Sequence, residues 1–153
     1  MNLSEPSQII GFNPFQRASK GDVSVQVDRR IAATMHAWGV ENADETPTLE
    51  RTLRLVYTTL IEQQLSFHHA QYLIDFNAQQ IRSALIKKIN SPLVKKEWEE
   101  LGQMRAKDFR NEVLSAKNRL FRLLTSKTLG RFLNASGSGL DLADIIENGK
   151  VLW

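Results

Sequence analysis

The sequence predicts an all-α fold, a bundle of about six to eight helices with short extended segments at both termini. Apolar residues recur at spacings of three and four along most of the chain. The one plausible strand pattern, at the C-terminal end, stops after three apolar residues, which is too short to bury a face alone. The 153 residues are 42% hydrophobic and 24% charged, as in one ordinary globular domain.

Three segments are expected along the chain. Residues 1–21 form an extended N-terminal segment, because Pro14 disfavours helix at Asn13. Residues 22–148 form the helical domain. Residues 149–153 form a truncated strand, which resembles the start of a strand that should enter a sheet elsewhere.

The first helix lies within residues 22–39 and stops at Gly39. The alternation of Val23 and Val25 with polar residues places its start near Asp28. Its inward face is expected to carry the apolar residues spaced by four, four and three, Val27, Ile31, Met35 and Trp38.

The second and fifth helices share one start signal, a capping hydroxyl followed by proline, at Thr46-Pro47 and at Ser91-Pro92. The second helix covers about 47–63. The residues expected to face the core are Leu49, Leu53, Val56 and Leu60 in the second helix, and Val94, Trp98 and Leu101 in the fifth.

Ser66 is expected to cap a third helix and Asn77 a fourth. A long sixth helix spans about 107–124, and a short seventh begins at Ser126. Asp141 caps a last helical turn after a Gly/Ser loop at 134–139. The residues expected to face the core are Phe67, Ala70, Leu73 and Ile74 in the third helix, Ile81, Leu85 and Ile89 in the fourth, Phe109, Val113, Ala116, Leu120, Leu123 and Leu124 in the sixth, and Leu129, Phe132 and Leu133 in the seventh.

Positive charge is concentrated in one third of the chain. Residues 82–131 carry 13 Lys and Arg against 5 Asp and Glu, a net charge of +8, whereas the whole chain has +3. Such an excess attracts phosphate backbones, although an ordinary solvated helix surface is the alternative interpretation. The candidate DNA-contacting residues are Lys87, Lys88, Lys95, Lys96, Lys117, Arg119, Arg122 and Arg131.

No motif for catalysis or cofactor binding is found. The chain has no cysteine, so disulfides, thiolate metal sites and cysteine nucleophiles are excluded. The phosphate-binding loop GxxxxGK[ST], GxGxxG and HExxH are absent. Adjacent His68 and His69 point about 100° apart on a helix and cannot share one metal. We interpret Glu97, Glu99 and Glu100 as a solvent-exposed, salt-bridged cluster rather than an acid–base pair. We therefore expect no enzyme activity, no cofactor and no metal.

A membrane span is not expected either, because no apolar run approaches about 20 residues. The first fifteen residues lack the basic start and apolar middle of a signal peptide. A cytoplasmic protein is the expectation.

Several short motifs, in order, resemble the helical insert of FtsK–HerA superfamily ATPases, closest to the conjugative coupling-protein and HerA-like pumps of type IV secretion. They are Gly11-Phe12-Asn13-Pro14-Phe15, Ala37-Trp38-Gly39, Thr46-Pro47-Thr48-Leu49-Glu50-Arg51, Ser115-Ala116-Lys117-Asn118-Arg119-Leu120, Leu140-Asp141-Leu142 and Glu147-Asn148-Gly149-Lys150-Val151-Leu152. In that family an all-α domain follows an FNP segment, and a strand then leads back into a RecA-like sheet.

The resemblance implies a helical domain without its motor, because the family's phosphate-binding loop and acidic strand would lie before residue 1 and after Trp153. It implies contact with DNA, with the ATPase core or with proteins of the transfer machinery. The apolar face that would pack on the missing sheet is expected to be partly exposed and to favour self-association. It comprises Phe12, Phe15, Ile145, Ile146 and residues 151–153.

Two other function classes remain open. A free-standing helical DNA-binding or regulatory protein would need a recognition helix after a tight turn, and none is evident in the basic segment. A purely structural interaction module would bind no nucleic acid at all.

Overall fold

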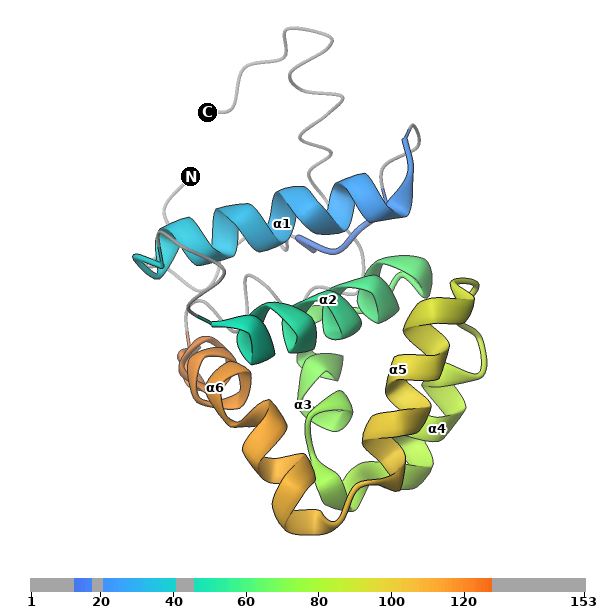
Figure 1. Ribbon diagram of the computed structural model, residues 1–153. Helices are drawn as coiled ribbons and strands as arrows, with labels where there is room; N and C mark the ends of the chain where they lie inside the picture. The colour runs from blue at the N-terminus through green and yellow to red at the C-terminus, as the bar shows by residue number, and fades with distance from the viewer. Residues whose placement is uncertain (1–12, 18–20, 41–45, 128–153) are drawn as a thin grey trace, which may run out of the picture.

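The computed structural model describes residues 13–17, 21–40 and 46–127, and these form an all-α bundle (Figure 1). The prediction of the fold class is confirmed, and the described residues include no strand. The helices are α1 (Val23–Ala37), α2 (Pro47–Glu62), α3 (Ala70–Leu73), α4 (Gln79–Ile86), α5 (Pro92–Gln103) and α6 (Ala106–Thr125), with 3-10 turns η3 (Phe67–His69) and η4 (Phe76–Ala78). The elements predicted beyond residue 127 lie outside the described residues.

Helix α2 is the centre of the bundle. Helix α1 crosses one side of it, α3 lies on the opposite side, and α5 and α6 flank it (Figure 1). Ten of its sixteen residues are buried, so the predicted inward face is correct but too narrow. Neighbours on several sides bury Leu55, Tyr57 and Ile61 as well, which one-sided amphipathicity cannot predict.

Helix α1 starts five residues earlier than Asp28, at Val23. The side chain of Asp22 accepts a hydrogen bond from the Ser24 amide at 2.7 Å and so caps the first turn. At the other end Gly39 has φ +69°, and the Val40 amide bonds the Met35 carbonyl oxygen. This is a Schellman ending, and it confirms Gly39 as the stop.

Proline occupies the first turn of both α2 and α5, as predicted, but only one of the two preceding hydroxyls caps its helix. The Ser91 hydroxyl accepts from the Val94 amide at 3.4 Å. Thr46 forms no cap hydrogen bond, and its buried hydroxyl oxygen has no hydrogen-bond partner among the described residues. The prediction of a capping Thr46 is therefore wrong, because the residue's backbone does not adopt the extended conformation seen at Ser91.

The start of α4 also differs from the prediction. Asn77 lies inside η4, whose cap is Asp75, accepting from the Asn77 amide at 3.0 Å. Helix α4 follows from Gln79, and Ala78 at its N-cap position forms no side-chain cap bond. Ile81 is 47% exposed, whereas Arg82 is 2% exposed and takes the inward position. The Arg82 guanidinium lies 4.6 Å from the centre of the Phe109 ring and donates to the Asp75 carbonyl oxygen at 2.7 Å. These contacts offset the cost of burying a charge.

The remaining inward faces agree with the prediction. The buried side chains are Phe67, Ala70, Leu73 and Ile74 in η3, α3 and the residue after it, Ile89 after α4, Trp98 and Leu101 in α5, and Phe109, Val113, Ala116 and Leu120 in α6. Leu85, Val94, Leu123 and Leu124 are partly buried against this core.

The turn at Asn13-Pro14-Phe15 packs against the core and is not exposed. The Asn13 side chain accepts from the Phe15 amide and donates to the Leu65 carbonyl oxygen at 3.2 Å. Phe15 is 4% exposed and stacks on Phe67 with ring centres 5.6 Å apart. The expectation that Phe15 is exposed is therefore wrong, because this turn returns it to the bundle. Phe12, Ile145, Ile146 and residues 151–153 lie outside the described residues.

Candidate nucleic-acid interface

Four of the candidate basic residues gather where α4 is joined to α5. We call Lys87, Lys88, Lys95 and Lys96 the α4–α5 lysine group. Lys87 is the C-cap of α4 and Lys88 follows it, while Lys95 and Lys96 lie in the first turns of α5. Lys95 is half-buried and the other three are exposed. Since α4 contacts α5, the group occupies one end of that helix pair.

Little negative charge offsets this group. Lys96 lies 3.9 Å from a carboxylate oxygen of Glu100, and its side chain is 71% exposed. A pair with that length and exposure contributes little. Within the described part of the chain, Lys87, Lys88 and Lys95 form no ion pair. The lysine ammonium groups are therefore available to an external anion.

The candidate residues on α6 differ in their exposure and contacts. Lys117 and Arg122 are exposed. Arg119 is partly buried, donates to the Ser115 hydroxyl at 2.5 Å, and lies 5.7 Å from the centre of the Trp38 ring. Arg119 thus links α6 to the end of α1, which is a structural role. Arg131 lies outside the described residues.

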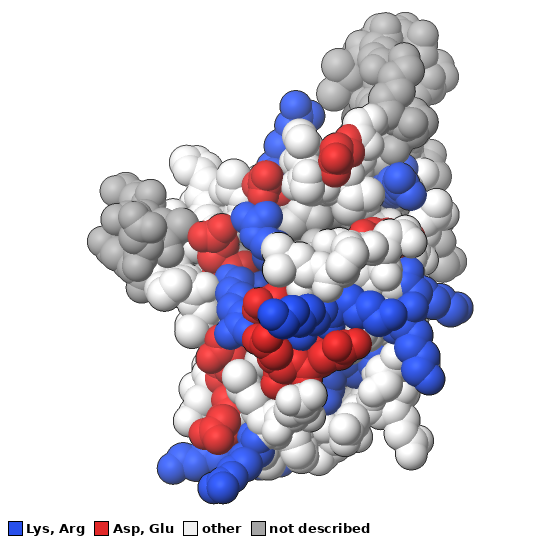
Figure 2. Space-filling model, turned by 45° about the vertical axis from the view of Figure 1, so that its right-hand side comes forward, with Lys and Arg blue, Asp and Glu red and all other residues white. Residues whose placement is uncertain are grey.

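The candidate residues on α6 belong to a different part of the bundle from the α4–α5 lysine group. Below α2 in Figure 1, α4 and α5 lie at the right and α6 at the left, with α3 between them. Figure 2 shows the α5 side with basic and acidic side chains interleaved, not a uniformly basic face. The positively charged residues that are neighbours in the sequence are therefore distributed over α4, α5 and α6, because the chain crosses the bundle between α5 and α6.

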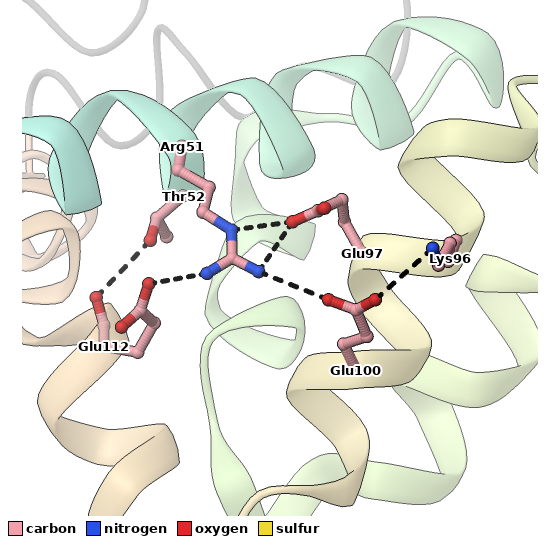
Figure 3. A network of polar contacts seen from close by, with 6 residues as sticks. All are labelled: Arg51, Thr52, Lys96, Glu97, Glu100 and Glu112. Atoms are coloured by element: carbon pink, nitrogen blue, oxygen red, sulfur yellow. Dashed lines mark hydrogen bonds and ion pairs between the residues drawn. The ribbon is translucent and has the colours of Figure 1, made fainter.

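A polar network around Arg51 joins α2, α5 and α6 (Figure 3). The Arg51 guanidinium contacts Glu97 of α5 at 2.6 Å and Glu112 of α6 at 3.0 Å. Glu100 lies 4.0 Å from the guanidinium and in turn faces Lys96. Thr52, next to Arg51, reaches the main-chain oxygen of Glu112 at 3.5 Å.

This network joins three helices through the Arg51 guanidinium. Burial works to lower the pKa of Arg51, but hydrogen bonds and negative charge from Glu97 and Glu112 outweigh it and raise the pKa above its usual value. The interpretation of the glutamates as a cluster paired with neighbouring lysines holds for Glu100 alone. Arg51 could not be recognised as their partner from the sequence, because it lies 46 residues from Glu97.

The histidines of the described residues form no metal site. His69 shares a hydrogen bond with the Ser66 hydroxyl at 3.0 Å, and His68 contacts Gln71. No group of three His, Asp or Glu side chains within residues 13–17, 21–40 and 46–127 could hold a metal ion. No helix in those ranges is both long and apolar enough to cross a membrane.

Comparison of the chain with protein-family models, with curated proteins and with solved structures finds no match. The resemblance to FtsK–HerA ATPases therefore stays a prediction from the sequence motifs.

Proposed function

We propose that this chain is a non-catalytic helical domain that contacts the DNA phosphate backbone, and that it is related to the helical insert of DNA-translocating ATPases. Its partners would be DNA and the ATPase core or transfer proteins. The observation that carries the proposal is the α4–α5 lysine group, in which three of four ammonium groups form no ion pair with described residues.

The position of this group is a second reason to look for an external anion. The partial positive charge at a helix N-terminus disfavours cations, yet Lys95 and Lys96 lie in the first turns of α5. The helix itself therefore does not stabilise them. A phosphate backbone would, and lysines that neutralise phosphates position a protein without reading the base sequence.

Paired charge-removal variants test this proposal. The test variant is Lys87→Gln, Lys88→Gln, Lys95→Gln and Lys96→Gln together. Its matched control removes four exposed cations elsewhere, Arg29→Gln, Arg105→Gln, Lys107→Gln and Lys127→Gln. Affinity for a labelled duplex is measured by fluorescence anisotropy at low salt. We expect the test variant to bind at least about tenfold more weakly than the unmodified chain, and the control to lose much less. Equal losses would contradict a localised interface.

A titration with magnesium and ATP tests the non-catalytic part. We expect no ATP turnover, because phosphoryl transfer needs the loop amides, lysine and metal ligands together, and the sequence has no phosphate-binding loop. Micromolar ATP affinity with magnesium-dependent hydrolysis would contradict it.

A further inference from the structure

An apolar groove runs between α1, α6 and the Asn13–Phe15 turn. It has a volume of about 340 Å³. Ala33 and Ala37 line it from α1, Leu123 lines it from α6, and the ring of Phe15 lies between them. The small side chains on α1 leave room for another segment to approach closely.

One cation, Arg30, lines this groove, and a second, Arg119, contacts the lining residue Trp38; no carboxylate of the described residues pairs with either. Arg30 lines the groove and donates hydrogen bonds to the main-chain oxygens of Pro14, Gln16 and Gln26. Arg119 lies over Trp38, another lining residue. Burial lowers the pKa of Arg30, so its charge would be stabilised by a carboxylate nearby. The groove therefore suits an apolar segment that also carries negative charge.

Residues 140–147 of the same chain, outside the described part, have this chemistry. Their sequence, Leu-Asp-Leu-Ala-Asp-Ile-Ile-Glu, combines four large apolar side chains with three carboxylates and no cation. They follow Lys127 by a twelve-residue link, 128–139. At about 3.3 Å per residue this link can span roughly 40 Å, more than the length of about 30 Å expected for α6. The segment can therefore reach the groove from the end of α6.

We infer that residues 140–147 occupy the α1–α6 groove of their own chain, with the apolar side chains against Ala33 and Ala37 and the carboxylates toward Arg30 and Arg119. Attachment to the same chain favours this occupant over a free partner, because a short tether supplies an effective concentration of about millimolar. This inference is independent of DNA binding.

The absence of native cysteine allows a direct test by thiol reactivity in the full chain. Ala33→Cys places a thiol in the groove, and Ala32→Cys is the matched control, since Ala32 is also exposed but lines a different pocket with Asp28 and His36. The rate of reaction with a small thiol reagent is measured for each. We expect A33C to react at least about tenfold more slowly than A32C, because a thiol covered by residues 140–147 reacts only when that segment opens locally. Adding Ile145→Asp and Ile146→Asp should restore the fast rate.

Three results would overturn the inference. The A33C and A32C rates could be equal, the protection of A33C could persist with the Asp substitutions, or it could disappear on dilution, which would indicate a second copy as the occupant. If circular dichroism shows that the Asp variant has lost helix, Asp141→Lys with Asp144→Lys serves instead. We expect this charge-reversed variant also to abolish protection, and retained protection would contradict the role of the carboxylates.

Discussion

Thr59 shows how one hydroxyl satisfies two buried groups. It donates to the Leu55 carbonyl oxygen at 2.8 Å and accepts from the Trp98 indole nitrogen at 3.0 Å. Both Thr59 and Trp98 are at most 1% exposed. The hydrogen bond therefore fixes α5 against α2 at a point that water does not reach.

Replacing Thr59 by valine keeps the shape and removes the acceptor. We expect T59V to lower the free energy of unfolding by about 1–3 kcal/mol, because the Trp98 N–H is left buried and unpaired. Thr58→Val is the control, since Thr58 is buried on the same helix and its side chain forms no hydrogen bond to a described residue. Urea denaturation measures both. Equal effects for the two variants would be inconsistent with the indole bond.

Tyr57 predicts a loss of stability in strong alkali. Burial raises its pKa to about 12, and the hydrogen bond with Thr34 only partly opposes this. Because the tyrosine keeps its proton in the folded state while the unfolded chain releases it near pH 10, the stabilising contribution is complete below pH 10 and falls as pH rises toward 12. We expect the advantage of the wild-type chain over Y57F to shrink by up to about 1.4 kcal/mol per pH unit in that window.

The measurement is urea denaturation of the wild-type chain and Y57F at several pH values between 9 and 12. Comparing the two chains cancels the lysines that also titrate there. A difference that stays constant with pH would show that Tyr57 is not shifted.

At the scale of elements, Arg51 joins three helices. We expect Arg51→Met to lower the free energy of unfolding by about 1–2 kcal/mol, a value reduced for the 35% exposure of its side chain, because Glu97 and Glu112 lose their common partner. Lys96→Met is the control and should cost less than about 0.5 kcal/mol, since its pair with Glu100 is long and exposed. Chemical denaturation measures both. An R51M variant as stable as K96M would show that the network contributes no stability.

The two cap positions before proline give another contrast. Ser91→Ala removes a hydroxyl that accepts from the Val94 amide, and we expect it to cost about 1 kcal/mol. Thr46→Ala removes a buried hydroxyl without a partner, so we expect no loss of stability. Thermal denaturation of the two variants tests this, and equal losses would contradict the assignment of the caps.

Some helix boundaries were predictable from neighbouring residues alone, although the caps at Asp22 and Asp75 were missed. The proline starts of α2 and α5 and the stop at Gly39 depend on neighbouring residues only. The inward position of Arg82 was not predictable, because it depends on Phe109 and on the Asp75 main chain. Nor was the burial of Phe15, which requires Phe67 from a distant segment.

At the scale of the whole molecule, the central position of α2 explains what the sequence could not give about the candidate interface. The candidate basic residues come from one continuous segment of the sequence, residues 82–131. In the bundle the α4–α5 lysine group belongs to one pair of helices and Lys117 and Arg122 to α6, and Figure 1 shows α3 between α6 and that pair. The identity of the exposed cations was predictable, but their grouping depends on how the helices pack.

The central claim is that the chain contacts DNA through phosphates and not through bases. The most direct test is the salt dependence of its affinity for two duplexes of unrelated sequence, measured by fluorescence anisotropy. For four phosphate contacts we predict a plot of log affinity against log salt with a slope of about −3 to −4, equal for both duplexes. No binding at low salt, or strong preference for one duplex, would contradict the claim, in favour of a structural module in the first case and a sequence-specific regulator in the second.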